Sequence, residues 1–98
     1  MELLFSNEDL DKLEIDPRFE AGYSPGVVKA FRKRLQQIRA AEDERAFHAL
    51  RSLNFEKLRG DRAHQHSMRL NDQWRLILEL RGSGKGKVVH VIDIEDYH

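Results

Sequence analysis

QWRLILELRGSGKGKVVHVIDI, residues 73–94, is the stretch of this 98-residue chain that decides its fold. Its first part alternates an apolar set of side chains with a mostly charged set: Trp74, Leu76, Leu78 and Leu80 against Arg75, Ile77, Glu79 and Arg81. This period of two predicts a strand over 73–81 with one buried face, so Arg75 is expected to point away from the core. Because Trp74 is in phase with the buried leucines, we expect it to pack on the sheet and not against a nucleic-acid base.

The rest of this stretch predicts a turn followed by a second strand. Glycine, serine and lysine fill 82–86, which suits a tight turn, and β-branched residues dominate 87–94. A nearly continuous apolar run is typical of a central strand covered on both faces. His90 lies in the middle of this run, where we expect a hydrogen-bonded core histidine. Residues 67–70 and the turn at 71–72 precede the stretch and complete an antiparallel meander.

In the residues before the meander, apolar side chains recur with the spacing of a helix. Ser24 and Pro25 are typical of a helix N-terminus. The apolar stripe of the helix that follows comprises Val28, Phe31, Leu35 and Ile38. A second helical stretch over 42–51 is expected to bury Phe47 and Leu50, and to form with the first either a helical hairpin or one bent helix.

The first residues predict an edge strand and a short helix. Glu2–Phe5 is short and apolar, and Ser6 with Asp9 resembles a capping box that starts a helix ending before Pro17. Helices that come mainly before the strands of a sheet predict an α+β fold.

Length and composition limit what this chain can be. With 98 residues and 40% hydrophobic residues, we expect one domain over 1–98 with a thin core and no second catalytic domain. The absence of cysteine excludes disulfides, zinc–thiolate sites and thiol nucleophiles, and fits a cytoplasmic protein. The apolar stretch at the start is followed closely by Asn7, Glu8 and Asp9, so it is too short to be a signal peptide or a membrane span.

The net charge of zero conceals three segments of different sign. Residues 1–23 carry −5, residues 24–92 carry +8 and residues 93–98 carry −3. Since salt limits the reach of distant acids to about 8 Å, the basic middle can present a positive surface to a phosphate backbone. The alternative is a solvated surface of mixed sign.

Several residues in and near the C-terminal segment have the chemical groups needed to cut RNA without a metal. That reaction needs a base for the ribose 2′-OH, cations for the phosphorane charge and an acid for the leaving 5′-oxygen. Guanidinium groups suit a phosphate, and four lie near the C-terminal segment: Arg59, Arg62, Arg69 and Arg75. Tyr97 and His98 supply a hydroxyl group and an imidazole, which can take either protonation state near neutral pH.

Three blocks of sequence resemble the HigB branch of the RelE-type bacterial toxins: LRGDR at 58–62, SMRLNDQWRL at 67–76 and DIEDYH at 93–98. The resemblance implies a RelE-like fold with two helices on a small twisted antiparallel sheet. It also implies a ribosome-dependent endoribonuclease, an mRNA interferase without cofactor or metal. The implied partners are messenger RNA, the ribosome and a HigA-like helix-turn-helix antitoxin, with no membrane.

The resemblance also suggests which residues form the site. Asp96, Tyr97 and His98 match the family's C-terminal catalytic Asp-Tyr-His, and Arg75 matches a strand arginine that contacts the scissile phosphate. Arg59 stands where many relatives have a catalytic lysine, in the sequence LKGDR. Glu56 stands where some members have a catalytic histidine, which leaves base and acid open among Glu56, Tyr97 and His98. The residues expected to bind RNA around them are Lys33, Arg62 and Arg69.

Two other functions remain open. A ParE-like gyrase inhibitor would share the scaffold but lack a ribonuclease site, and the terminal Asp-Tyr-His argues against it. A degenerate, non-catalytic toxin-like module would only bind an antitoxin or nucleic acid, and the zero net charge and Glu56 favour it. His64 and His66 have no third ligand nearby, so they predict no metal site.

Overall fold

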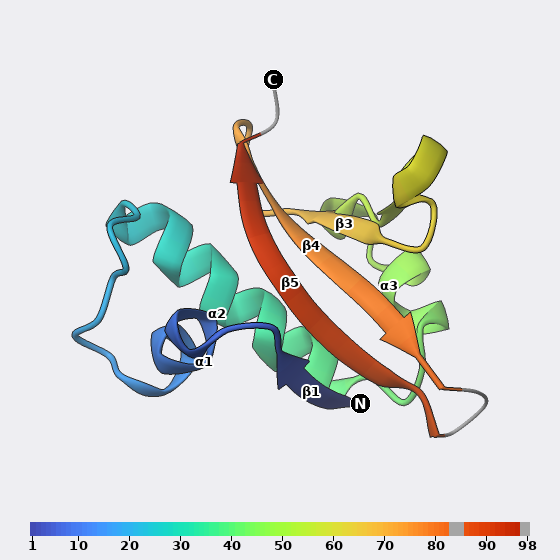
Figure 1. The fold of residues 1–98 in the computed structure, drawn as a ribbon, viewed down its shortest axis with the longest axis horizontal. Coiled ribbons are helices and arrows are strands. Elements are labelled where there is room, and N and C mark those ends of the chain that lie inside the picture. Colours follow the sequence, from blue (N-terminus) through green and yellow to red (C-terminus); the bar gives the residue numbers. More distant parts are fainter. Residues whose placement is uncertain (83–85, 97–98) are drawn as a thin grey trace.

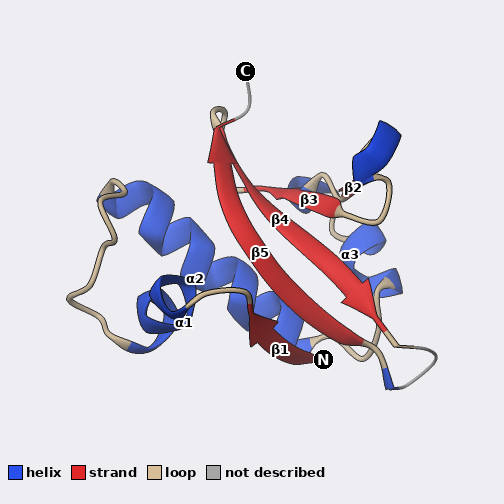
Figure 2. Cartoon of the chain, in the orientation of Figure 1, coloured by secondary structure: helices blue, strands red, loops and turns tan. Residues whose placement is uncertain are grey.

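The computed structural model describes residues 1–82 and 86–96. Over these residues the elements follow in this order: β1 (Glu2–Phe5), α1 (Glu8–Ile15), α2 (Pro25–Ala40), α3 (Arg45–Ala49), the 3₁₀ turn η1 (Arg51–Leu53), β2 (Glu56–Lys57), the 3₁₀ turn η2 (Gly60–Arg62), β3 (His66–Arg69), β4 (Trp74–Arg81) and β5 (Val88–Asp96). The strands form one sheet in the order β1-β5-β4-β3-β2 (Figure 2). β1 is parallel to β5 and the other neighbours are antiparallel, so the sheet is mixed and not antiparallel throughout as the resemblance implied. The α+β class is as predicted.

The β4–β5 hairpin forms as the sequence predicts, with one irregularity. Ile77 pairs with Asp93 and Leu78 pairs with Val91, so Ile92 is an extra residue in β5 and forms a β-bulge. The bulge shifts the alternation of β5 by one residue, and Ile94 is therefore buried together with Val91.

The prediction that 87–94 is covered on both faces is only half right. β5 lies between β1 and β4, and Val89 and Val91 on its helix side are fully buried. On the other side Val88 and His90 are only half-buried. His90 lies opposite Leu4 and Glu79 in the sheet register and is not a core residue, which corrects that prediction.

The long helix begins as predicted. Ser24 accepts a hydrogen bond from Val27 N, Pro25 is the first helical residue, and the buried side chains of α2 are Val27, Val28, Phe31, Leu35 and Ile38. The Arg32 guanidinium donates hydrogen bonds to the carbonyls of Leu13, Asp16 and Phe19. These bonds tie the end of α1 to α2.

Two expectations about the helices are wrong. The cap of α1 is Asn7, whose Oδ1 accepts a hydrogen bond from Leu10 N at 3.0 Å, while Ser6 Oγ donates to the carbonyl of Ile92 and so joins β1 to β5. The stretch over 42–51 forms neither a hairpin partner of α2 nor a bent continuation of it. Leu50 leaves the helical conformation, so α3 is only five residues long and Leu50 is 42% exposed. Phe47 is buried as predicted.

The core fills the space between the helices and one face of the sheet. In Figure 1, α1 and α2 lie to the left of β5, and α3 lies to the right, near β3 and β4. Trp74 packs against this core and meets Tyr23 edge-on, with ring centroids 5.6 Å apart, which confirms its packing role. No helix in the described part of the chain is long and apolar enough to cross a membrane.

Candidate active site

The sheet face turned away from α1 and α2 carries a cavity of about 460 Å³. Its lining residues come from β3, β4, β5 and the segment around η2: Leu58, Arg62, Ser67, Arg75, Ile77, Glu95 and Asp96. Three of them, Ser67, Arg75 and Ile77, are almost fully buried, although they lie outside the main core. A larger cavity of about 740 Å³ near Met1 and Lys87 contains none of the predicted site residues.

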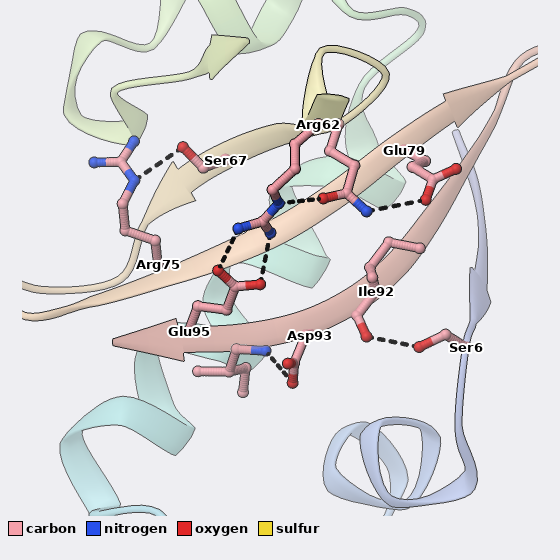
Figure 3. A network of polar contacts seen from close by, with 10 residues as sticks. Ser6, Arg62, Ser67, Arg75, Glu79, Ile92, Asp93 and Glu95 are labelled. Atoms are coloured by element: carbon pink, nitrogen blue, oxygen red, sulfur yellow. Dashed lines mark hydrogen bonds and ion pairs between the residues drawn. The ribbon is translucent and has the colours of Figure 1, made fainter. Parts of the chain in front are cut away.

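Arg75 is the best-fixed cation of this cavity. Its Nε donates a hydrogen bond of 2.9 Å to Ser67 Oγ (Figure 3). Its Nη2 donates one of 2.7 Å to the carbonyl of Asn54. The residue is only 6% exposed. It points away from the core as predicted, but it is buried beneath the 54–67 region and is no solvated surface charge. A charge buried in this way is held in one orientation by its hydrogen bonds.

Arg62 reaches the same cavity from η2. Its guanidinium donates two hydrogen bonds to the carboxylate of Glu95, at 3.0 and 2.6 Å, and its Nε donates to Gln65 Oε1 (Figure 3). The side-chain hydrogen bond from Arg62 to Glu95 raises the pKa of the arginine. Arg62, expected to bind RNA, is thus neutralised by an internal carboxylate.

Gln65, which accepts a hydrogen bond from Arg62, links the Arg62–Glu95 pair to Glu79, a second acidic residue of the sheet. Gln65 Nε2 donates to Glu79 Oε2 at 3.3 Å, and Arg81 also donates to Glu79. Burial alone would raise the pKa of Glu79, but these hydrogen bonds, together with the charges of Arg81 and His64, outweigh it and lower the pKa. The network fixes the η2 segment on the sheet.

Asp96 closes the cavity at the end of β5. It lies opposite Trp74 in the register, and its Oδ2 accepts a hydrogen bond of 3.0 Å from Gln73 Nε2. Asp96, the first residue of the predicted Asp-Tyr-His group, therefore lines the cavity that Arg75 also lines. Tyr97 and His98 lie outside the described residues.

The remaining predicted site residues lie outside the cavity lining. Glu56 is exposed in β2 directly opposite Ser67, so its carboxylate is on the same sheet face as Arg75. Arg59 is exposed at the start of η2. Arg69 lies opposite Arg75 in the register and pairs with Asp72.

Lys33 is separated from the others. It is exposed on α2, where it lines a groove with Pro17, Glu20 and Lys29. Since α2 packs on the opposite face of the sheet, Lys33 is no part of this cavity.

Sequence reasoning missed three groups that complete the site. Ser67 and the carbonyl of Asn54 orient Arg75, and Glu95 pairs with Arg62. A signal existed for Ser67, because a serine in phase with Arg69 on a strand next to Arg75 lies on the arginine's face. A backbone carbonyl leaves no such signal in a sequence.

The two histidines of the η2 region have separate surroundings. His66 stacks on Phe55, with ring centroids 4.7 Å apart and an interplanar angle of 4°, whereas His64 is exposed. Burial and, next, the charge of Lys57 lower the pKa of His66. Among the described residues, no group of three or more metal-ligating side chains is close enough to hold an ion.

The chemistry that this arrangement allows is recognition of an anion. A fixed guanidinium can stabilise charge that develops on a phosphate oxygen without reorganising during the reaction. Asp96, which also lines the cavity, carries a carboxylate that can orient a neighbouring titratable group.

Comparisons with known proteins agree with this fold. The sequence model of a family described as "RelE-like toxin of type II toxin-antitoxin system HigB" matches residues 4–98. A solved structure of a YoeB/ParE toxin from Agrobacterium tumefaciens matches with a TM-score of 0.63 and 21% sequence identity, over 100% of both chains. At that identity the likeness shows the fold alone. No curated protein matches the sequence significantly.

Proposed function

Because this chain belongs to the HigB family of RelE-like toxins of type II toxin–antitoxin systems, we propose that it cuts messenger RNA on the ribosome without a metal. The observation that carries the proposal is the fixed guanidinium of Arg75 in the same cavity as Asp96. A preorganised cation can stabilise the negative charge that develops when a phosphate ester is transferred.

The proposed reaction is an internal transfer of the phosphate ester. The ribose 2′-oxygen attacks the adjacent phosphorus, its proton passes to a base, and the bond from phosphorus to the 5′-oxygen breaks. The products are a 2′,3′-cyclic phosphate and a 5′-hydroxyl group that has taken a proton from an acid. No water, metal or redox partner is consumed in this step.

Each group has one task in this scheme. Arg75 stabilises the negative charge of the phosphorane, and Arg59, exposed near the rim, adds a second cation once RNA is bound. Asp96 orients the terminal pair. His98 is the general acid or base, Tyr97 positions the nucleotide or assists proton transfer, and Glu56 is the other candidate base.

We assign binding of the RNA backbone to Arg62 and Arg69, two other arginines on the cavity side of the sheet. Arg62 and Arg69 each pair with a carboxylate that is at least one-third exposed. Ion pairs of this kind contribute little to stability, so a phosphate can replace the carboxylate at small cost. Lys33 would act separately, on ribosomal or messenger RNA that reaches α2.

Membership of a toxin–antitoxin family implies an antitoxin partner. We propose that it is a HigA-like helix-turn-helix protein, encoded in an adjacent reading frame. Co-expression of that protein should restore growth, and an adjacent frame without such a protein would contradict the assignment.

Primer extension on a translated reporter tests the activity. Expression of the chain should arrest growth and produce new 5′ ends within translated messages, and purified protein should cut programmed ribosomes equally with or without a metal chelator. Equal cutting of naked RNA would contradict ribosome dependence. Growth arrest with intact messages and altered DNA supercoiling would indicate a gyrase inhibitor, and neither effect would indicate a non-catalytic binding module.

A further inference from the structure

Two aromatic rings stack behind the groups that hold Arg75. The ring centroids of Phe55 and His66 are 4.7 Å apart, and the two planes are nearly parallel. Phe55 follows Asn54, whose carbonyl accepts from Arg75 Nη2, and His66 precedes Ser67, whose hydroxyl accepts from Arg75 Nε. The stack thus connects the neighbours of both acceptors.

The rings lie on the other side of β3 from the cavity. Ser67 lines the cavity, and because side chains alternate along a strand, His66 and Met68 point the opposite way. Met68 is fully buried in the core, and Phe55 packs edge-on against the buried Phe47, at 5.3 Å between ring centroids. Neither ring lines the cavity, so any effect on Arg75 passes through the backbone.

Asn54 is the acceptor that most needs such support. Its φ of 46° and ψ of 54° are left-handed, a conformation that asparagine adopts more readily than most residues with a β-carbon. The strand that follows, β2, has only two residues and so few interstrand hydrogen bonds. Phe55, on the carbonyl side of Asn54, and the fully buried Leu53 on its other side therefore anchor this residue.

We infer that Phe55 and His66 are positioning residues for Arg75: their stack keeps the Asn54 carbonyl and the Ser67 hydroxyl at the spacing that holds the guanidinium in the cavity. Only the catalytic consequence rests on the proposed function. The ordering of Arg75 is a property of the free protein.

Nuclear magnetic resonance of the Arg75 Nε–H group tests the ordering directly. The signal is assigned by its loss in Arg75→Lys. In Phe55→Leu and His66→Ala, hydrogen exchange of this group should be about tenfold faster, the factor that loss of one hydrogen bond to a charged group gives. His66→Phe keeps a ring in the stack and should exchange as slowly as the wild type.

A matched control separates positioning from general loss of stability. Val27→Ala removes buried volume from α2, far from the stack, and should lower the melting temperature without speeding Arg75 exchange. Equal exchange in wild type and Phe55→Leu would overturn the inference. It would also be overturned if His66→Phe exchanged as fast as His66→Ala, or if Val27→Ala had the same effect.

Single-turnover cleavage on programmed ribosomes tests the consequence. The maximal rate should fall about tenfold in Phe55→Leu at unchanged half-saturation, and His66→Phe should restore the rate lost in His66→Ala. If even the wild type does not cleave while Arg75 exchange responds as expected, the proposed function fails and the positioning role stands. Unchanged cleavage with faster exchange would overturn the catalytic part of the inference.

Discussion

An arginine on a small sheet is usually a solvated charge, but Arg75 is 6% exposed and its contacts include Ser67 and Asn54. Burial makes these bonds important for two reasons. They compensate the desolvation of the guanidinium, and they fix its direction. The same side chain therefore contributes to both stability and the proposed chemistry, in contrast to the exposed Arg59.

Replacing Arg75 should affect both properties. Arg75→Ala leaves polar groups of Ser67 and Asn54 without a donor, and should lower the free energy of unfolding by about 1–3 kcal/mol, more than the 0.5 kcal/mol typical of surface positions. Cleavage should fall about 10²- to 10³-fold, by analogy with removing an oxyanion-hole donor. Denaturant unfolding and single-turnover cleavage measure the two effects. Ser67→Ala, which keeps the charge, should show a smaller loss of rate, and a full rate in Arg75→Ala would remove Arg75 from the site.

His66 should make stability depend on pH. Burial lowers its pKa from 6.5 in the folded state, with Lys57, His48 and Lys87 acting in the same direction and Glu44 opposing them. A group with a lowered folded pKa binds more protons when unfolded, so its contribution is present above about pH 6.5 and is lost as the pH falls through the folded pKa. Denaturant midpoints at pH 7.5 and 5.5 should differ less in His66→Phe than in the wild type. His64→Gln, at an exposed site, should keep the wild-type difference, and an equal pH dependence in all three proteins would contradict this prediction.

At the scale of elements, the β4–β5 hairpin carries the site and depends on its connection. Gly82 has a φ of 93°, and a β-carbon there would lie 2.7 Å from the carbonyl oxygen of Gly86. At Gly86 itself a β-carbon would meet nothing within 4 Å. Gly82 and Gly86 thus differ in whether they tolerate a β-carbon.

This difference gives a matched pair of variants. Gly82→Ala should lower the free energy of unfolding by at least about 1 kcal/mol, because alanine is strained at positive φ and also clashes with the backbone. Gly86→Ala should stay within about 0.5 kcal/mol of the wild type. Thermal and denaturant unfolding of both proteins check the prediction, which fails if the two variants are equally stable.

The residues that follow β5 should be needed for activity but not for folding. Every described pair between β4 and β5 lies within Val88–Asp96, so deleting Tyr97 and His98 should leave the melting temperature nearly unchanged. Cleavage should disappear. His98→Gln, which keeps a hydrogen-bonding group but cannot exchange a proton near neutral pH, should lower the rate and flatten its pH profile. A normal rate in the truncated chain would contradict the proposed site, and a normal His98→Gln profile would leave Glu56 or Tyr97 as the acid or base.

At the scale of the whole molecule, the acidic first segment and the cavity lie on different sides of the sheet (Figure 1). Three acids of α1, Glu8, Asp9 and Asp11, stand in its first turn, where they interact favourably with the helix dipole. Glu14, near the end of α1, accepts two hydrogen bonds from Arg39 of α2. The acidic first segment therefore lies beside α2 and neutralises part of it. The cavity, with Arg75 and the nearby Arg59, is on the other side of the sheet.

Salt dependence of RNA binding should reveal this division. On a short single-stranded RNA, Arg59→Ala should reduce the slope of log affinity against log salt by about 0.7, the value for one lost phosphate contact. Lys33→Ala should leave the slope unchanged, because such an RNA in the cavity does not reach α2. Titrations at several salt concentrations measure both slopes, and equal reductions would contradict the assignment of RNA to one side.

The sequence by itself determined the strand over 74–81, the helix after Ser24, the edge strand at the start and the α+β class. These features depend on local periods and caps, which a single stretch of residues carries. It also indicated Arg75 and Asp96 as site residues, and the structure brings these two to one cavity. Only the tertiary structure decided the strand order, the bulge at Ile92, the short α3 and the burial of Arg75. Each of these results from contacts between segments far apart in the chain, and the carbonyl of Asn54, which helps to hold Arg75, is a backbone group that every residue possesses.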